Sequence, residues 1–156
     1  MEKATFAAGC FWGVDMIFRK IDGVLSTMVG YTGGHTQNPT YDQVCSGTTG
    51  HAESVEIVFD PDKVSYEKLL NIFWDNHNPT TLNRQGPDVG SQYRSAVFYH
   101  NDRQKELALS IKEKLQKSGQ FKSEIVTEIV IANTFYKAEE YHQQYLEKRE
   151  IGGCKI

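Results

Sequence analysis

The sequence predicts an α+β fold in which a mixed β-sheet and a layer of helices form a two-layer sandwich. Several short segments are typical of β-strands, and others carry apolar side chains at the spacing of a helix face. The two kinds of segment do not alternate strictly, as they would in a parallel α/β fold. The chain has 156 residues, the size of one domain, and no repeat or linker divides it. We therefore expect one domain over residues 1–156.

The first half of the chain is predicted to hold three strands and two helices. They are expected at 3–8 (strand), 10–21 (helix), 24–31 (strand), 52–59 (strand) and 66–77 (helix). The first strand ends in small residues, and Gly23 stops the helix that follows it. Ser65 marks the start of the second helix as its N-cap. The stretch 33–50 is rich in turn residues and is a candidate binding loop.

The second half is predicted to hold two more strands and two more helices. They are expected at 94–100 (strand), 102–118 (helix), 125–132 (strand) and about 137–148 (helix). The first of these helices has an apolar stripe and stops at Gly119. An irregular stretch at 78–92 precedes these elements, so two long loops are available to frame one site. Gly152-Gly153 predict a flexible C-terminal tail from about residue 150.

Charge and hydropathy exclude several classes of protein. The net charge is -3 and the pI is near 5.9, so the chain has no basic surplus with which to neutralise nucleic-acid phosphates. The start, MEKATFAAGC, is too short and too polar for a secretory signal. No apolar run approaches the roughly 18 residues of a membrane span. We expect a soluble, cytoplasmic monomer that binds neither nucleic acid nor membranes.

Cysteine and histidine usage predicts thiol chemistry without a metal. Cys10, Cys45 and Cys154 are odd in number and lack the close spacing of a disulfide scaffold or a zinc site. We expect them to be thiols in a reducing compartment. The five histidines are scattered, and no pair has the spacing that metal sites require.

Cys10 is predicted to lie at the start of the first helix. Unpaired backbone amides and the positive end of the helix dipole favour the thiolate there, which is the form that attacks electrophiles. A free cysteine is more often a small hydrophobic residue packed under a sheet, and placement alone does not decide between these interpretations.

Trp12 falls outside the apolar arc of the same helix. Its helical position is beside Asp15 and Arg19, on the side expected to face solvent. An indole on that side either packs beneath a loop or forms an aromatic wall for an apolar ligand group.

The segment Gly9-Cys10-Phe11-Trp12-Gly13, which follows a short strand, resembles the signature of the A-type methionine sulfoxide reductases. Further stretches resemble that family in order and approximate spacing: Gly30-Tyr31, Asn38-Pro39-Thr40-Tyr41, Thr49-Gly50-His51-Ala52-Glu53, Pro79-Thr80-Thr81-Leu82-Asn83, and Asp88 through Gly90-Ser91-Gln92-Tyr93-Arg94-Ser95. The resemblance covers nearly the whole chain. It implies a ferredoxin-like plait wrapped by extended coil, and one catalytic domain over 1–156.

Glu53 is predicted to lie on the buried face of a strand. It shares that face with Val55, Ile57 and Phe59. Burial there disfavours the carboxylate and raises the pKa, which makes Glu53 a proton donor at neutral pH. The alternative is a glutamate at the wet, frayed end of the strand.

The resemblance implies a role for each further residue of the site. Glu53 protonates or hydrogen-bonds the sulfoxide oxygen, and Tyr41 and Tyr93 are additional donors to that oxygen. Asp88 supports the hydrogen-bond network. Phe11 and Trp12 form the pocket for the methyl group of the substrate. Without the shared motifs, each tyrosine would be read as an ordinary surface or core residue.

The implied mechanism is reduction through a sulfenic acid on Cys10. Cys154 then condenses with this sulfenic acid to give a disulfide, which thioredoxin reduces, or dithiothreitol in vitro. No tightly bound cofactor is needed. A surface cysteine without a role is the alternative for Cys154. Cys45 matches no catalytic position and is expected to be structural.

Three rival functions share parts of this pattern. A thiol peroxidase has the same reactive thiol, and a redox-sensing or sulfoxide-binding module would oxidise Cys10 without turnover. A cysteine hydrolase would need a histidine base, for which only His51 is a candidate. The residues leave open whether free or protein-bound methionine sulfoxide is preferred.

Overall fold

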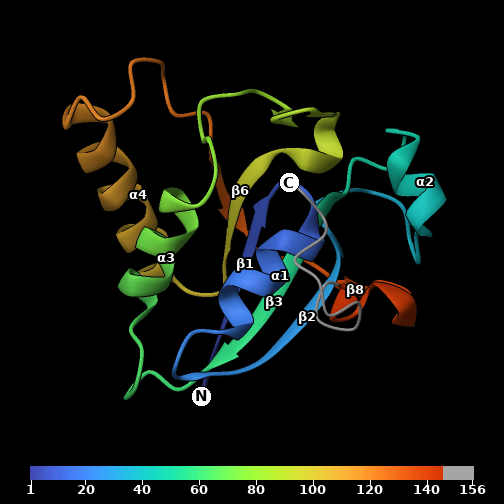
Figure 1. Cartoon of the computed structure of the whole chain (residues 1–156), viewed down its shortest axis with the longest axis horizontal. Coiled ribbons are helices and arrows are strands. Elements are labelled where there is room, and N and C mark those ends of the chain that lie inside the picture. The colour runs from blue at the N-terminus through green and yellow to red at the C-terminus, as the bar shows by residue number, and fades with distance from the viewer. Residues whose placement is uncertain (146–156) are drawn as a thin grey trace.

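A six-stranded mixed sheet forms the centre of the computed structural model, which describes residues 1–145 (Figure 1). The strand order is β7-β6-β1-β3-β2-β8. The strands are β1 (Glu2–Ala8), β2 (Val24–Thr32), β3 (Ala52–Phe59), β6 (Ser95–Tyr99), β7 (Glu128–Ile131) and β8 (Tyr136–Lys137). The neighbours pair antiparallel except β6 and β7, which are parallel. The predicted mixed sheet is confirmed.

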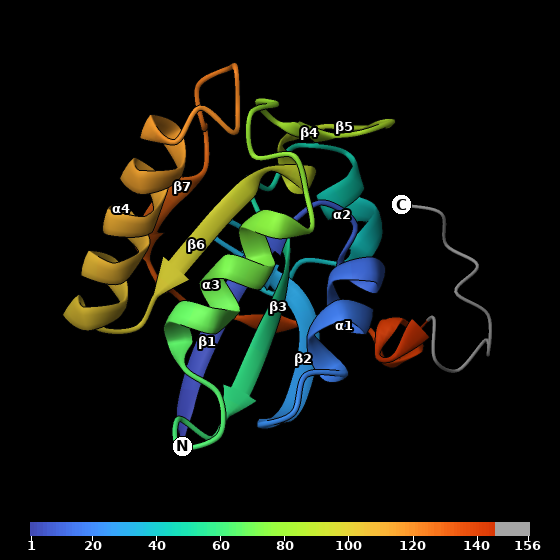
Figure 2. The same cartoon turned by 60° about the vertical axis from the view of Figure 1, so that its left-hand side comes forward.

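Helices α1 (Phe11–Arg19), α3 (Tyr66–Asp75) and α4 (Asp102–Lys117) cover one face of the sheet (Figures 1 and 2). The order β1-α1-β2-β3-α3-β6 along the chain, with the spatial order β6-β1-β3-β2, is that of a ferredoxin-like plait. This arrangement confirms the predicted two-layer sandwich. Ser65 caps α3 as expected, because its side chain accepts a hydrogen bond from the Lys68 amide.

The main apolar core lies on the helix face of the sheet, and a smaller cluster lies on the other face. On β1, Phe6 stacks on Phe18 of α1 and Phe73 of α3, with ring centroids 5.3 and 5.0 Å apart. Its neighbour Ala7 points to the opposite face, where it packs with other small residues and Phe98. Because side chains alternate along a strand, successive residues of β1 pack on opposite faces of the sheet. Removing a buried ring such as Phe6 typically costs about 3–5 kcal/mol.

Extended coil covers the opposite face. The chain leaves β7 at one edge of the sheet and re-enters it as β8 at the other edge, so residues 132–135 must cross this face. Thr32 on β2 fixes the crossing by donating its hydroxyl to the Thr134 carbonyl, at 2.8 Å. Gly30 allows close approach, since a Cβ there would lie 2.5 Å from the Phe135 ring. The predicted wrapping by coil is confirmed.

The helix predicted at 137–148 is wrong over residues 137–144. Tyr136–Lys137 pair with β2, Glu140–His142 form the 3-10 helix η2, residues 143–144 form a turn, and Tyr145 is α-helical. The side chain of Gln143 explains the difference, because its amide both accepts from and donates to the backbone of Val29 on β2, at 3.0 and 2.9 Å. These bonds to a distant strand hold the segment in a non-helical conformation, although its apolar residues have helical spacing. Residues 146–156, with the predicted tail and Cys154, lie outside the described residues.

The two predicted loops contain short elements that periodicity did not reveal. They are α2 (Tyr41–Cys45), the hairpin strands β4 (Arg84–Gln85) and β5 (Asp88–Val89), and the 3-10 helix η1 (Ser91–Tyr93). Helix α2 begins with a capping box, in which Thr40 and Gln43 bond to each other's backbone amides. Both loops bring these elements toward the start of α1 (Figure 2).

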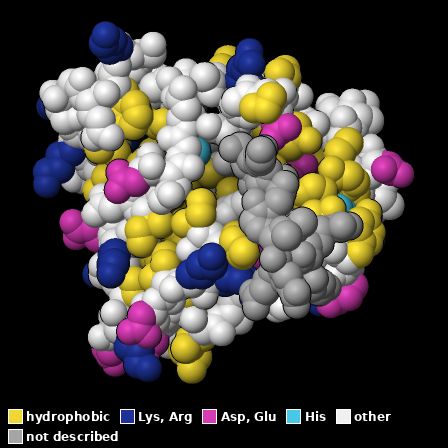
Figure 3. All heavy atoms as spheres, in the orientation of Figure 1, with side chains coloured by type: hydrophobic (Ala, Val, Ile, Leu, Met, Phe, Trp, Pro, Cys, Tyr) yellow, Lys and Arg dark blue, Asp and Glu magenta, His cyan; other side chains and the backbone are white. Residues whose placement is uncertain are grey.

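Charged side chains of both signs are mixed on one face of the molecule. On the face shown in Figure 3, Lys and Arg side chains are scattered among acidic ones rather than gathered in a patch. Among residues 1–145, no helix is both long enough and apolar enough to cross a membrane.

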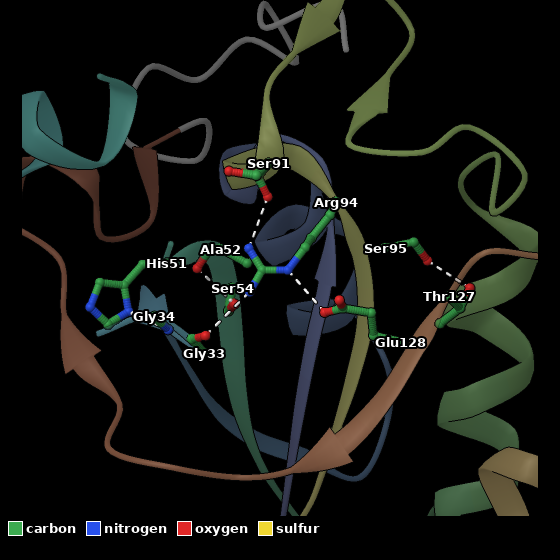
Figure 4. A network of polar contacts seen from close by, with 10 residues as sticks. All are labelled: Gly33, Gly34, His51, Ala52, Ser54, Ser91, Arg94, Ser95, Thr127 and Glu128. Atoms are coloured by element: carbon green, nitrogen blue, oxygen red, sulfur yellow. Dashed lines mark hydrogen bonds and ion pairs between the residues drawn. The ribbon is translucent and has the colours of Figure 1, made fainter. Parts of the chain in front are cut away.

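A buried polar chain ties α3 to the start of β6. The indole of Trp74 donates to Thr127 at 3.0 Å, and the hydroxyls of Thr127 and Ser95 are 2.8 Å apart (Figure 4). Ser95 is in turn 2.7 Å from Nε2 of His77, whose Nδ1 lies 2.6 Å from the Phe73 carbonyl. A carbonyl only accepts, so Nδ1 donates and Nε2 of the neutral ring accepts from Ser95. Protonation of His77 would reverse this chain.

We predict that His77 makes the fold sensitive to acid. Burial lowers its pKa from 6.5 to about 4. Between these values the unfolded chain binds a proton that the folded chain rejects, so stability falls as the pH drops from 6.5 toward 4. The loss is about 3 kcal/mol. Urea unfolding at pH 6.5 and 4.5 should show a smaller loss for His77→Gln than for the wild type. Equal losses would contradict the prediction.

Candidate active site

Cys10 lies at the start of α1, as predicted. It is the N-cap residue, and its side chain is only 9% exposed. The turn from β1 into α1 requires Gly9, whose φ is +95°. A Cβ at Gly9 would also lie 2.8 Å from the side chain of Gln85, so β4 packs directly against the residue before Cys10. Cys10 therefore begins α1 directly after a residue that is packed against the β4-β5 hairpin.

Glu53 on β3 is buried next to this helix start. Its side chain is 1% exposed, and Oε1 accepts a hydrogen bond from the Phe11 amide at 3.2 Å. Among residues 1–145, Oε2 is buried and has no hydrogen-bond partner. Burial raises the pKa of Glu53 to about 8, the charge of Asp88 adds to the rise, and the Phe11 amide opposes it. The predicted burial is confirmed, and Glu53 holds its proton at neutral pH.

Tyr41 and Tyr93 lie on different elements but close to Glu53. Tyr41 begins α2 and Tyr93 ends η1. The pKa of each phenol is raised, first by burial; a hydrogen bond with Cys45 and then the carboxyl of Glu53 add to the rise for Tyr41, and Glu53 adds to it for Tyr93. Asp88 on β5 raises the pKa of Tyr93 in the same way. Both hydroxyls are therefore neutral donors, and the structure brings all four groups together.

Phe11 and Trp12 directly follow Cys10 on α1, and Phe11 is only 1% exposed. The Phe11 ring is stacked against Tyr41, with centroids 6.5 Å apart. Trp12 stacks on Tyr145 at 3.9 Å, and its Nε1 donates to Nδ1 of His142 at 3.0 Å. The indole thus packs beneath the chain segment 138–145, which runs alongside α1.

The sequence analysis expected the side of α1 that carries Asp15 and Arg19 to face solvent, and the structure corrects this expectation. Asp15 is only 3% exposed, and it forms an ion pair with Arg19 at 3.4 Å. Helical position correctly placed Trp12 beside these residues. The segment 138–145 lies over that part of α1, which the sequence could not show because a helix was predicted there.

Two site residues were missed by sequence reasoning, Glu139 and His142. Glu139 accepts from the Tyr31 hydroxyl at 2.9 Å and from the Tyr41 amide at 3.0 Å, so it fixes the start of α2. His142 is 1% exposed and packs against the rings of Phe11 and Tyr41, with centroids 5.3 and 4.5 Å away. The one available signal was the concentration of aromatic residues near the end of the chain, which was assigned to the helix at 137–148.

His51 is held by backbone groups and not by Cys10. Its Nδ1 accepts from the Gly34 amide at 3.0 Å, and its Nε2 lies 2.6 Å from the Thr36 carbonyl. Both ring nitrogens are therefore occupied in fixing the loop after β2. This removes His51, the candidate named from the sequence, as the base that a cysteine hydrolase would need.

Cys45 lies at the end of α2 and is exposed. Partial burial of the thiol raises its pKa, and a hydrogen bond with the Tyr41 hydroxyl lowers it in part. The sequence placed Cys45 only in the loop after Tyr41, and α2 brings it to the rim of the site. Within the described part of the chain, no group of three His, Cys, Asp or Glu side chains could hold a metal ion.

Comparison with known proteins identifies the family. The profile of the family described as "Peptide methionine sulfoxide reductase" matches residues 2–156. The chain belongs to this family. The MsrA of Methanothermobacter thermautotrophicus is 63% identical over 99% of this chain and 92% of its own length. Peptide methionine sulfoxide reductases of the A type are thus its relatives.

Solved structures of the family have the same fold. Reduced Mxr1 from Saccharomyces cerevisiae superposes with a TM-score of 0.90, at 38% identity, over 97% of this chain and 87% of Mxr1. The same yeast protein in complex with Trx2 gives a TM-score of 0.65, at 29% identity, over 92% of this chain and 84% of the other. The chain is therefore an oxidoreductase that reduces methionine sulfoxide with a thiol.

Proposed function

We propose that Cys10 is the nucleophile of the reduction and that Glu53 is its proton donor. The Cys10 thiolate attacks the sulfur of methionine S-sulfoxide, and Glu53 gives a proton to the oxygen. The oxygen ends on Cys10 as a sulfenic acid, and methionine leaves as the reduced thioether. The unpartnered Oε2 of a buried, protonated Glu53 beside Cys10 carries this proposal.

The neighbouring residues hold the sulfoxide for this step. Tyr41 and Tyr93 donate their hydroxyls to the oxygen, since their raised pKa values keep both protonated. Phe11 and Trp12 receive the methyl group of the substrate against their rings. Asp88 supports the network, and its charge helps to keep the proton on Glu53.

The second half of the cycle removes the oxygen. The Cys154 thiol condenses with the sulfenic acid, which forms a Cys10–Cys154 disulfide and releases water. A dithiol then reduces the disulfide, and the complex of yeast Mxr1 with Trx2 supports thioredoxin in this role. The chain acts as one catalytic domain, as a cytoplasmic monomer without a tightly bound cofactor.

The test of the function is to give the enzyme each sulfoxide epimer with dithiothreitol. We expect methionine from the S epimer and none from the R epimer, because membership of the A-type family implies the S epimer at sulfur. A parallel peroxide assay separates this activity from that of a thiol peroxidase. Faster consumption of peroxide than of either epimer would contradict the proposal.

We predict that Cys154→Ser blocks recycling but not the first turnover. The variant should form about one methionine per enzyme and keep a sulfenic acid that dimedone traps. Turnover with thioredoxin should collapse, while dithiothreitol restores part of it by attacking the sulfenic acid directly. The matched control is Cys45→Ser, which should turn over normally. Normal turnover of Cys154→Ser, or a Cys10–Cys45 disulfide in the oxidised wild type, would give the resolving role to Cys45.

A further inference from the structure

The turn that carries Tyr93 is held by side chains on both sides of it. Gly90 enters the turn with a φ of 144°, and β6 begins two residues after Tyr93. Before Tyr93, the side-chain amide of Gln92 donates to the Cys45 carbonyl of α2 at 3.4 Å. After it, the side chain of Arg94 leaves toward the coil-covered face of the sheet (Figure 4). Gln92 therefore contacts α2, Tyr93 lies at the site, and Arg94 reaches the opposite face of the sheet.

Arg94 binds three separate segments of the chain. Its Nη1 donates to the Ser91 carbonyl within the turn, at 3.0 Å. Its Nη2 donates to the Gly33 carbonyl at the end of β2, at 3.5 Å, and its Nε bonds to the Glu128 carboxylate on β7, at 3.0 Å (Figure 4). The guanidinium provides a planar fork of donors that a lysine does not have. The turn is thereby tied to both halves of the sheet.

The packing around Arg94 leaves little freedom. Its side chain is 12% exposed, whereas that of Glu128 is half exposed. Gly33, at a φ of +85°, has no room for a side chain, since a Cβ would lie 2.9 Å from Nη2 of Arg94. The partner carboxylate is solvated, so the ion pair alone contributes little stability. The effect of these contacts is geometric.

We propose that Arg94 is a positioning residue that fixes the hydroxyl of Tyr93 toward the sulfoxide oxygen. The inference rests on the proposed contact between Tyr93 and that oxygen. The other end of the turn leads into the hairpin, whose base is closed by the Gly90 amide and the Asn83 carbonyl at 2.8 Å. The turn also packs on β3 and continues into β6, and Arg94 adds side-chain hydrogen bonds to β7 and to the end of β2. A displacement of about 1 Å at a reacting group can cost about 100-fold in rate.

A double-mutant cycle tests this role. Single-turnover reduction of methionine S-sulfoxide is measured for Arg94→Ala, Tyr93→Phe and the double variant. We expect Arg94→Ala to slow the wild type about tenfold or more, but to slow the Tyr93→Phe enzyme less than about twofold, since the hydroxyl that it positions is then absent. Arg94→Lys should restore part of the rate. Because it keeps the positive charge, it also completes the cycle if Arg94→Ala does not fold.

Lys112→Ala is the matched control. Lys112 also binds a backbone carbonyl, that of Thr127 at 3.0 Å, but it does not contact the turn of Tyr93. We expect it to lower the melting temperature without changing the single-turnover rate. An equal loss from Arg94→Ala in both backgrounds, or no loss in either, would overturn the proposal. A fully active Tyr93→Phe enzyme would overturn it too, while the wild-type rate still reports the reductase itself.

Discussion

Cys10→Ser should abolish the formation of methionine while the protein stays folded. A hydroxyl is a poor nucleophile toward sulfur, and it cannot store the oxygen as a sulfenic acid. The two side chains differ little in size, and Cys10 makes no side-chain capping bond that serine would lose. Serine is itself a favoured N-cap residue, so α1 should start at the same place. The loss is therefore expected in the chemical step alone.

The measurement is methionine released in a single turnover, together with thermal unfolding of the same variant. We expect less than about 1% of the wild-type rate and a melting temperature equal to or above that of the wild type. Cys45→Ser is the control, because it removes the other described thiol near the site. Substantial methionine from Cys10→Ser would remove Cys10 as the nucleophile, and a partly unfolded variant would assign the loss to the fold.

The helix–strand core was predictable because each element follows a local rule. The strand at 52–59 has the bounds that its alternation predicted, and that alternation also placed Glu53 among buried apolar groups. Gly23 and Ser65 marked helix boundaries through backbone conformation and capping. These signals are all contained within a few residues of the element they define.

The segment 138–145 could not be predicted, because distant residues determine its conformation. Ala138 and Tyr145 have helical spacing, but Gln143 bonds to Val29 and Glu139 to Tyr31, more than 100 positions away. The same cause hid the anchoring of Tyr93 by Arg94. Motif resemblance named Tyr93, yet only the fold shows that Gly33 and Glu128 meet at the next residue.

Glu53→Gln should slow the sulfoxide step about 100- to 10,000-fold, the range typical of general acid catalysis. Glutamine still accepts the bond from the Phe11 amide, but it has no proton to transfer. The wild-type step should slow above about pH 8, where Glu53 loses its proton. That slowing should be absent in the variant. Single-turnover rates across pH 6 to 10 are the measurement, and equal rates at neutral pH would make Glu53 a structural residue.

The same substitution should make the fold more stable, which separates loss of chemistry from loss of structure. Folding raises the pKa of Glu53 from 4.5 to about 8. Its contribution is therefore greatest below pH 4.5 and is lost as the pH rises through 8, by up to about 5 kcal/mol. Neutral glutamine does not titrate, so Glu53→Gln should gain stability over the wild type as the pH rises from 5 to 8.5. A variant that is slower and also less stable at pH 8.5 would show that the buried carboxyl is held by compensating contacts, and it would contradict the assignment of a strained proton donor.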